Sequence, residues 1–504
     1  MYHIEDENAI AARGDFMELY TNTRNDALRI TASRAILSGM AEDGGLYVMK
    51  SLPALDAKRV CGLGAREISV EVLLALLPDF TREAMRGIVD RAYEGRFETQ
   101  DITPLVKVGG VWVLELFRGP TSAFKDVALC ALPQLLCEAK AMNGEAEDTM
   151  ILAATSGDTG KAALSGFADI PGTKIAVFYP YGGVSAIQRA QMVTQEGRNV
   201  AVCAVRGNFD DAQSAVKRVF QRAGEGGAQF KNIKLSSANS INVGRLAPQV
   251  MYYYKAYGEL MRNGEISFGD EVDFVVPTGN FGDILAGYIA KRMGLPVGRL
   301  VCASNKNDVL TQFIDTGVYD RRREFYKTAS PSMDILISSN LERLLYYECG
   351  GNAAHVRMFM HRLAYDGHYA VEPDMLFRIR DTFLARSCDD AETFFTIRRV
   401  FESHGYLLDT HTAVAWSAAG ALGEGRPTVV LSTASPYKFA GDVLRAVTGE
   451  DEADGFAAME KLSRVSGTPI PKGLADLCEK RERHTDVIDI ADVFDYVQRK
   501  AKEL

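Results

Sequence analysis

The amino-acid sequence predicts an α/β protein in which two lobes each contain a mostly parallel sheet covered by helices. Two observations carry this prediction. From about residue 149 short apolar runs alternate with amphipathic runs, and a second such cycle begins at about residue 241. Apolar runs bounded by turns are typical of strands buried on both faces, and the amphipathic runs between them are typical of covering helices. At 504 residues the chain is too long for one core, so two or three domains are expected.

The elements follow in order. The first cycle predicts strands at 148–155, 173–180 and 199–207 and helices at 160–169, 185–197 and 209–224. The second predicts strands at 271–279, 299–305 and 428–436 and helices at 241–260, 282–294, 308–317 and 437–449. In such α/β sheets ligands bind at the carboxyl ends of the strands, so a binding site is expected between the two lobes.

The rest of the chain predicts a three-part organisation. Residues 1–100 are mostly helical in pattern and form an expected N-terminal domain. Residues 101–450 form the expected core, with a smaller lobe at about 125–235 and a charged helical insertion at about 340–405. Residues 451–504 form a polar C-terminal segment.

The composition is that of a globular protein with 47% hydrophobic and 24% charged residues. A net charge of −9 argues against nucleic acid or an anionic membrane as the main partner. No stretch has the length of a membrane span, and MYHIEDENAI carries acids where a signal peptide carries bases. Eight scattered cysteines without a CxxC pair, and histidines without metal-ligand spacing, predict reduced thiols and no metal site. A cytoplasmic location is expected.

One lysine lies in an apolar turn. Lys125 follows GPTSAF (119–124) and precedes the helical run VALCALPQLLCEAK (127–140). A lysine removed from water has a lowered pKa and is nucleophilic at neutral pH. Taken alone, this residue is more readily interpreted as a surface lysine paired with Asp126. The flanking Gly, Pro and Thr favour a buried turn.

Two turns rich in small residues, TSGDTG (155–160) and PTGNFGD (277–283), each follow an expected strand and begin an expected helix. Their hydroxyl, amide and glycine residues are Thr155, Ser156, Thr159, Gly279, Asn280 and Gly282. Free N–H groups at a helix N-terminus bind phosphate, and glycine permits close approach of the anion. Each turn alone is also consistent with an ordinary capped helix start. Two of them downstream of Lys125 favour anion sites.

Two further segments supply candidates. SSANSINVGRL (236–246) places Asn239, Ser240 and Arg245 at a helix start, and arginine suits a bidentate phosphate contact. LSTASPYKF (431–439) places Ser432 and Thr433 at a strand end, where a neutral hydroxyl can meet a pyridine nitrogen. Taken alone, the first segment is more readily interpreted as a helix cap with a surface arginine, and the second as an ordinary turn rich in Ser and Thr.

Other polar and aromatic residues are interpreted as structural. His411 is expected to lie at a helix start, and Tyr252, Tyr253 and Tyr254 are expected to pack along a helix.

The combination predicts a cofactor and a substrate class. A lysine beside two anion sites is what an enzyme requires if it holds pyridoxal phosphate as a Schiff base and acts on a phosphorylated substrate. The substrate is therefore expected to be a small molecule.

Ten ordered motifs carry a resemblance to a known family. They are DGGLYV (43–48), LELFRGPTSAFKDVAL (114–129), ILAATSGDTGKAAL (151–164), GNFDDAQ (207–213), SSANSINVGRL (236–246), VPTGNFGDILAGYIAKRMGLP (276–296), ASNKNDVL (303–310), SPSMDILISSNLERLLY (330–346), GYLLDTHTAVA (405–415) and LSTASPYKF (431–439). With them the chain resembles the threonine synthase family from about residue 20 to 490, in its longer branch with an extended N-terminal domain. This family belongs to the pyridoxal-phosphate enzymes of fold type II, the tryptophan synthase β family.

The resemblance implies a role for each candidate. Lys125 would hold pyridoxal 5′-phosphate, Thr433 would face its pyridine nitrogen, and Asp158 would lie near its 3′-oxygen. The cofactor phosphate would be held by Gly279, Asn280, Phe281, Gly282 and Asp283. The substrate phosphate would lie against Thr155, Ser156, Thr159, Asn239, Ser240 and Arg245, with Asn280 nearby.

Two motifs depart from the family pattern. YTNTRND (20–26) has Asn22 and Asn25 where the family has Ser and Gly, and DTHTAV has Thr410 where it has Pro. Neither change touches Lys125 or the anion sites, so they bear on the N-terminal segment and on one helix start.

The implied activity is that of a carbon–oxygen lyase, the conversion of O-phospho-L-homoserine and water to L-threonine and phosphate. The implied protein is a monomer or homodimer. One alternative is another fold type II enzyme, such as a serine/threonine dehydratase or a cysteine synthase, which lacks a second phosphate site. Another is a catalytically silent homologue, which has no need of the lysine. The Asn239–Arg245 segment argues against the first, and Lys125 argues against the second.

Overall fold

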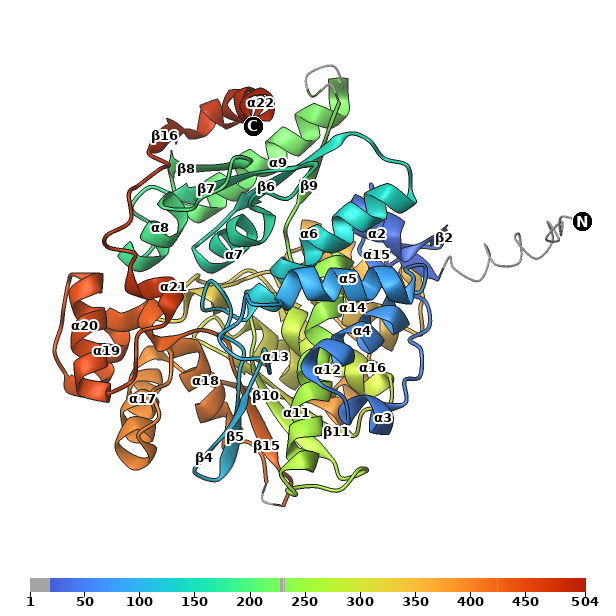
Figure 1. Ribbon diagram of the computed structural model, residues 1–504. Coiled ribbons are helices and arrows are strands. Elements are labelled where there is room, and N and C mark those ends of the chain that lie inside the picture. Colours follow the sequence, from blue (N-terminus) through green and yellow to red (C-terminus); the bar gives the residue numbers. More distant parts are fainter. Residues whose placement is uncertain (1–18, 227–229, 231, 424) are drawn as a thin grey trace, which may run out of the picture.

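The chain is built around two sheets that lie in separate lobes (Figure 1). The computed structural model describes residues 19–226, 230, 232–423 and 425–504, so MYHIEDENAI and the rest of the first eighteen residues of the expected N-terminal domain lie outside the described residues. One sheet has the strand order β14-β11-β10-β15-β5-β4 and the other the order β16-β8-β7-β6-β9. Every pairing is parallel except β4 with β5. The predicted fold class, with mostly parallel sheets covered by helices, is confirmed.

The five-stranded sheet of the smaller lobe is covered on both faces. Its strands are β6 (Asp148–Ala154), β7 (Thr173–Pro180), β8 (Val200–Arg206), β9 (Ile233–Ser237) and β16 (Asp486–Asp489). Its helices are α6 (Lys125–Met142), α7 (Asp158–Phe167), α8 (Ala186–Val193), α9 (Phe209–Gly226) and α22 (Val493–Glu503). Successive strand residues alternate between the faces: Met150 and Leu152 pack with α22 residues, and Ile151 packs in the core that contains α6 and α7.

The six-stranded sheet forms the larger lobe. Its strands are β4 (Leu105–Val108), β5 (Val111–Glu115), β10 (Val272–Pro277), β11 (Val297–Ser304), β14 (Phe383–Ser387) and β15 (Thr428–Ser432). Helices α11 (Met251–Arg262), α12 (Gly282–Arg292), α13 (Val309–Thr316) and α18 (Thr410–Ala419) cover it. Val275 and Val430 face α18, whereas Phe274 and Val276 face the core that contains α12. Both faces of this sheet are therefore buried, as its near-continuous apolar strands require.

Three expected elements differ from the structure. The helix expected at 241–260 is divided into α10 (Val243–Leu246), a 3₁₀ turn (Ala247–Val250) and α11. Pro248 accounts for the break, because it lacks the N–H that a continuous helix would need. The stretch 340–405 contains α14 (Leu341–Glu348), α15 (Ala353–Tyr365), α16 (Pro373–Thr382) and α17 (Asp390–His404), but it also supplies β14 to the sheet. The strand expected at 428–436 ends at Ser432, before a 3₁₀ turn (Pro436–Phe439).

The N-terminal residues are not only helical. Strands β1 (Tyr20–Asn22), β2 (Asn25–Ile30) and β3 (Tyr47–Met49) form an antiparallel sheet with the order β2-β1-β3. Helices α2 (Ala32–Ser38), α3 (Ala57–Cys61), α4 (Ala65–Leu76) and α5 (Arg82–Tyr93) follow, and α2 and α5 pack on α6. Asn22, one of the departures from the family pattern, donates to the carboxylate of Asp43 at 2.8 and 2.9 Å. These bonds hold β1 against the loop between α2 and β3.

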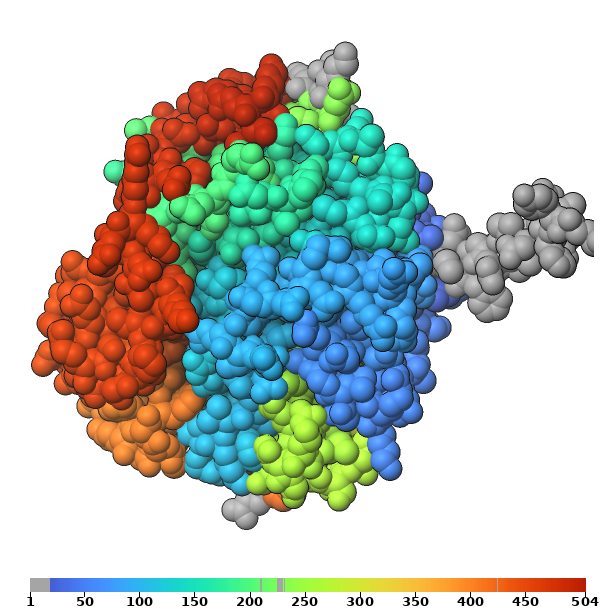
Figure 2. Space-filling model, in the orientation of Figure 1, coloured from blue at the N-terminus to red at the C-terminus, as the bar shows by residue number. Residues whose placement is uncertain are grey.

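The C-terminal segment returns to the smaller lobe. After α19 (Ala440–Thr448), α20 (Gly455–Ser466) and α21 (Lys472–Ala475) the chain reaches β16 and α22. Figure 2 shows these residues, in red, running along one side of the molecule from α20 to the smaller lobe. A minor sheet pairs β12 (Val318–Asp320) with β13 (His368–Ala370). Among the described residues no helix combines the length and apolarity needed to cross a membrane.

Candidate active site

The turn before α6 positions Lys125. Asp126 accepts hydrogen bonds from the backbone N–H of Thr121 at 2.8 Å and from its hydroxyl at 2.5 Å, which closes the turn. A Cβ on Gly119 would lie 2.5 Å from the Asp126 side chain, so only glycine fits there. Asp126 is thus engaged by its own turn, and the alternative of a surface Lys125–Asp126 pair is wrong.

Lys125 is a buried amine, 8% exposed. Its Nζ lies 3.6 Å from Oδ2 of Asp158 and 4.4 Å from the centre of the Phe124 ring. Burial lowers the pKa of Lys125; the charge of Asp158 opposes this, and the charges of Lys438 and Arg245 add to it. A lowered pKa leaves more of the amine unprotonated near neutral pH, which is the form that acts as a nucleophile or base.

Asp158, the first residue of α7, is held from one side. Its Oδ1 accepts from Nζ of Lys438 at 2.8 Å and from Nε2 of Gln188 at 2.9 Å. Its buried Oδ2 has no hydrogen-bond partner among the described residues and faces Lys125. Burial alone would raise the pKa of Asp158, but Lys438 and Lys125 hold it well below its usual value.

The turn before α7 is a preformed helix N-terminus. The hydroxyl of Thr155 accepts from the N–H groups of Gly157 and Gly160 at 3.0 and 2.9 Å, so its oxygen caps the helix. Ser156 and Thr159 are half-buried. Their backbone N–H groups donate no hydrogen bond within the described chain, and an anion can use them.

The turn before α12 is the second free helix N-terminus. Phe281 adopts a left-handed conformation with φ of 61°, and the hydroxyl of Ser338 donates to the carbonyl of Gly279 at 2.9 Å. A Cβ on Gly279 would lie 2.5 Å from the carbonyl of Ser332, which explains the glycine. In the described part of the chain the N–H groups of residues 280–283 donate no hydrogen bond, so they are available to a phosphate.

Asp283, in the first turn of α12, carries an unusual carboxyl. Burial raises its pKa to about 7, while a hydrogen bond from Tyr253 (3.2 Å) and the charge of Lys125 act in the opposite direction. A raised pKa favours the neutral form of this carboxyl, which limits its repulsion of an anion bound at the same turn.

The end of β15 lies beside Lys125. The carbonyl of Thr433 accepts from the N–H of Phe124 at 2.8 Å, and Ala123 and Ala434 form an isolated β-bridge. Thr433 is 5% exposed, and its hydroxyl makes no hydrogen bond to the described residues. The hydroxyl of Ser432 is instead 3.0 Å from that of Thr412, so Ser432 is engaged in packing α18 on the sheet.

Arg245 is a buried cation without an acidic partner among the described residues. It is 3% exposed, Nη1 donates to the carbonyl of Ala238 at 2.8 Å, and Nε is buried without a hydrogen bond. Burial lowers its pKa to about 10, so it remains charged at neutral pH. A buried guanidinium with unused donors is a site for an anion.

The two remaining candidates lie beside the α12 turn. Asn239 is exposed and Ser240 half-buried, and the Ser240 hydroxyl donates to the Asn239 side chain at 3.2 Å. Asn340 connects the segments, because its side-chain amide donates to the carbonyls of Ser240 (3.3 Å) and Asn280 (3.1 Å). No hydrogen bond between described residues joins the 155–160 turn to Arg245.

Three residues that contact the site were not assigned from the sequence. Lys438 and Gln188 hold Asp158, and Asn340 joins the two segments just described. Lys438 had a visible signal, since it lies in an apolar strand-to-helix junction. Gln188 and Asn340 had none, because a polar residue at a helix start is ordinary in sequence.

The residues interpreted as structural have structural contacts. His411 lies in the first turn of α18, where Nδ1 contacts Asp409 at 2.9 Å and Nε2 accepts from the N–H of Ser332 at 3.2 Å. The three consecutive tyrosines are fully buried, and the Tyr252 hydroxyl donates to the carbonyl of Phe124 at 2.9 Å.

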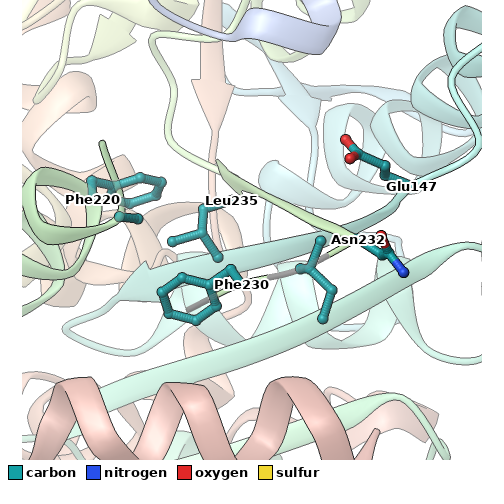
Figure 3. A pocket seen from close by; sticks show the side chains of 7 residues that line it. Glu147, Phe220, Phe230, Asn232 and Leu235 are labelled. Atoms are coloured by element: carbon teal, nitrogen blue, oxygen red, sulfur yellow. The ribbon is translucent and has the colours of Figure 1, made fainter. Parts of the chain in front are cut away.

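A cavity of about 530 Å³ lies elsewhere, beside β9 and the end of α9 (Figure 3). Its lining contains none of the predicted site residues: Glu147, Phe220, Ala223, Phe230, Asn232, Ile233 and Leu235. This cavity is therefore not part of the candidate site, which is identified from the contacts among Lys125, Asp158, Thr433 and the two turns.

The site suits pyridoxal phosphate. A buried amine with a lowered pKa, a buried carboxylate oxygen without a partner and a free helix N-terminus match the aldehyde, the ring oxygen and the phosphate of that cofactor. In agreement, residues 97–375 match the family described as pyridoxal-phosphate dependent enzyme. The fold and the site therefore define a pyridoxal-phosphate enzyme.

Comparisons with known proteins give the family within this class. Residues 19–93 match "Threonine synthase N terminus" and residues 412–497 match "Threonine synthase, C-terminal". A threonine synthase of Pseudomonas aeruginosa is 38% identical, over 92% of this chain and 95% of that protein. The chain belongs to the threonine synthase family.

Solved structures agree with this assignment. The crystal structure of pyridoxal-phosphate-bound threonine synthase from Brucella melitensis is 38% identical with a TM-score of 0.85, covering 96% of this chain and 99% of that one. Threonine synthase from yeast is 32% identical with a TM-score of 0.86, covering 97% and 99%. The cofactor of this family, pyridoxal 5′-phosphate, is the cofactor of this chain.

Proposed function

We propose that this chain converts O-phospho-L-homoserine and water to L-threonine and phosphate, as a carbon–oxygen lyase in threonine biosynthesis. The observation that carries the proposal is Arg245, a buried guanidinium without an acidic partner in the described chain, close enough to Lys125 for its charge to lower the pKa of that amine. A cofactor phosphate alone requires one anion site. Arg245 provides a second, which suits a substrate that carries its own phosphate.

The cofactor would be held by residues of both lobes. Lys125 would bind it covalently, Asp158 would face its 3′-oxygen, and Thr433 would offer a neutral hydroxyl to its pyridine nitrogen. Its phosphate would be held by the turn Gly279, Asn280, Phe281, Gly282 and Asp283, in which the N–H groups at 280–283 donate no hydrogen bond to any described residue. When bound, the cofactor withdraws electrons from the substrate and makes its Cα–H and Cβ–H protons acidic.

Lys125 would carry the protons. The overall reaction removes protons at Cα and Cβ, adds one at Cγ after the phosphate leaves, adds water at Cβ and finally returns a proton to Cα. Nζ of Lys125 has the lowered pKa that a base at neutral pH needs, and Asp158 orients it from 3.6 Å.

Arg245 and the α7 turn would stabilise the leaving phosphate. Its charge approaches −2 as the Cγ–O bond breaks, so a fixed cation and free N–H groups bind it more tightly at that stage than in the bound substrate. Thr155, Ser156, Thr159, Asn239, Ser240 and Arg245 form this proposed phosphate site. Because Thr155 caps the helix, its part is to fix the turn.

The alternatives predict different substrates. A serine/threonine dehydratase or a cysteine synthase acts on serine-type substrates and has no use for a buried Arg245. A silent homologue has no use for a buried Lys125 beside Asp158.

Product analysis tests the proposal. Purified enzyme with O-phospho-L-homoserine is expected to release L-threonine and phosphate in equal amounts. L-serine, L-threonine and O-acetyl-L-serine with sulfide are the comparison substrates. Release of keto acid from serine without turnover of O-phospho-L-homoserine would establish the dehydratase instead.

The organisation of the protein follows the same proposal. We infer an N-terminal domain at 1–100, a catalytic core at 101–450, with a smaller lobe at about 125–235 and an insertion at about 340–405, and a C-terminal segment at 451–504. The enzyme would act as a cytoplasmic monomer or homodimer and would bind no nucleic acid. Gel filtration with light scattering tests the oligomeric state.

A further inference from the structure

Three charged groups form a chain beside the proposed catalytic lysine. Nζ of Lys438 lies 2.8 Å from Oδ1 of Asp158, and Oδ2 of Asp158 lies 3.6 Å from Nζ of Lys125. Lys438 is fully buried, and its amine also donates to the carbonyl of Thr121 at 3.0 Å. One carboxylate is thus shared by two amines that come from opposite ends of the catalytic core.

We propose that Lys438 is a positioning residue that keeps the amine of Lys125 free of its proton by neutralising Asp158. The argument is a charge count in a buried site, where a net charge is costly. With Lys438 charged and Asp158 ionised, an unprotonated Lys125 leaves the group of three neutral. A proton on Lys125 gives it a net charge of +1.

Without the charge of Lys438, the protonated form of Lys125 becomes the one with no net charge. An unprotonated Lys125 beside ionised Asp158 leaves a net charge of −1, and one added proton makes the pair neutral. The pair then keeps that proton to a higher pH. An opposite charge within about 4–6 Å shifts a pKa by about 1 to 3 units, so the effect is large enough to measure.

The geometry gives Lys438 a second effect. Lys438 and Gln188 both occupy Oδ1 of Asp158, which leaves Oδ2 as the oxygen that faces Lys125. The carboxylate is therefore fixed in one orientation and offers only that oxygen to the site.

Other charged groups surround these three. Arg245 on α10 acts on Lys125, and Lys125 in turn acts on Asp283 on α12. Asp126 on α6 and Lys161 on α7 lie within reach of Lys438. Asp126 is bonded to Thr121, and Nζ of Lys161 donates to Gln195 at 2.5 Å, so neither replaces Lys438 as the partner of Asp158.

The test measures the protonation of Lys125 directly. Full-length protein freed of cofactor is labelled with acetic anhydride over a range of pH, and the modification of Lys125 is followed by peptide mass spectrometry. In Lys438→Met the pH of half-maximal labelling is expected to rise by about 1 to 3 units. The pH titration of the visible absorbance of the holoenzyme is expected to move in the same direction.

Lys140→Met is the matched control. Lys140 is also buried, and its amine also donates to a backbone carbonyl, that of Gly172 at 2.9 Å, but it forms no ion pair with Asp158. Its replacement is expected to leave the labelling of Lys125 unchanged. An equal shift in both variants, or no shift in Lys438→Met, would overturn the proposal.

A second pair of variants covers the case in which Lys438→Met does not fold. Asp158→Asn removes the negative charge between the two amines and leaves the positive charge of Lys438, so the pH of half-maximal labelling is expected to fall below the wild-type value. Adding Lys438→Met in that background removes both charges and is expected to raise it again. No rise between these two variants contradicts the proposal.

The inference rests on the proposed function for its purpose but not for its test. Labelling of Lys125 requires neither cofactor nor substrate. If threonine formation failed while the labelling shifts appeared, the proposed reaction would fall and the role of Lys438 would stand. If threonine formed but the labelling shifts did not appear, the proposed reaction would stand and the role of Lys438 would fall.

Discussion

Arg245→Met is expected to lower activity without lowering stability, which is the signature of a cation kept for a ligand. The substitution retains most of the side-chain volume and removes the guanidinium, which is 3% exposed and has no acidic partner among the described residues. Activity and stability change for different reasons, so each can be worked out from the structure.

The stability effect follows from burial of the charge. Burial lowers the pKa of Arg245 to about 10. Against an ordinary value of about 12.5, and at 1.36 kcal/mol per pH unit, burying the charge costs roughly 3 kcal/mol. Methionine removes that cost but leaves the carbonyl of Ala238 without its donor, which costs about 1–3 kcal/mol. The substrate-free variant is therefore expected to be as stable as the wild type or slightly more stable.

The activity effect follows from the lost contact to phosphate. A hydrogen bond to a charged group contributes about 1.5–3 kcal/mol, which corresponds to a roughly ten- to hundredfold fall in kcat/KM for O-phospho-L-homoserine. Inorganic phosphate is expected to raise the melting temperature of the wild type, because it binds only the folded state, and to have less effect on the variant. The visible absorbance of the bound cofactor is expected to remain normal.

Arg262→Met is the matched control. Arg262 also donates to a backbone carbonyl, that of Cys61 at 3.1 Å, but it lies at the end of α11 away from the anion turns. Its loss is expected to leave kcat/KM unchanged. Arg245 is removed from the phosphate site if its variant keeps the wild-type kcat/KM, or if both variants lose activity only through lower stability.

Three further outcomes are expected. Lys125→Ala abolishes turnover and the visible absorbance of the cofactor, and borohydride reduction followed by mass spectrometry no longer attaches cofactor to the chain; covalent attachment at another lysine would refute the assignment. Thr433→Asp lowers the amount of threonine formed per substrate consumed and raises the amount of keto acid, because a carboxylate holds a proton on the pyridine nitrogen and so strengthens the electron withdrawal by the ring. An unchanged ratio of threonine to keto acid at an unchanged rate of turnover would mean that Thr433 does not face the ring. In the wild type, the affinity for the cofactor is expected to fall as the pH rises through about 7, because burial raises the pKa of Asp283 to about 7 and the carboxyl then ionises beside the phosphate. In a pH titration of cofactor binding, Asp283→Asn is expected to abolish this fall in affinity. If the fall persists in the variant, it belongs to another group.

The features predicted from sequence are those encoded by neighbouring residues. A strand, a glycine turn and a helix start are contiguous in TSGDTG and in PTGNFGD, so the N–H groups of Ser156, Thr159 and residues 280–283, which donate no hydrogen bond in the described chain, follow from local patterns. The parallel sheets follow likewise from alternating apolar and amphipathic runs. The family resemblance then related these separate turns to one site.

The features that were missed depend on residues far apart in the chain. Lys438 reaches Asp158 across 280 residues, and no local pattern shows which buried carboxylate a lysine will meet. The strands β1 and β3 have only three residues each, and the six residues of β2 are largely exposed, so no apolar pattern is long enough to separate these strands from the adjacent helices. The break in the helix at Pro248 is predictable from the proline itself, but the apolar pattern on both sides favoured one continuous helix.

The first turn of α14 explains why the N-terminal residues belong to the catalytic unit. Arg343 is fully buried and donates to the carbonyl of Tyr47 in β3 at 2.9 Å, to the carbonyl of Ile241 at 2.5 Å and to the side chain of Asn340. Asn340 in turn donates to the carbonyls of Ser240 and Asn280.

One helix turn thus bonds the small N-terminal sheet, the segment before Arg245 and the turn before α12. Glu342 strengthens the same junction, since it accepts from Thr23 at 2.6 Å and pairs with Arg24 at 2.8 Å. Because buried, fully bonded polar groups tolerate little displacement, a shift of the N-terminal sheet has to move the segment before Arg245 and the turn before α12, or break these bonds. The position of the segment before Arg245 and of the turn before α12 therefore depends on residues 20–49.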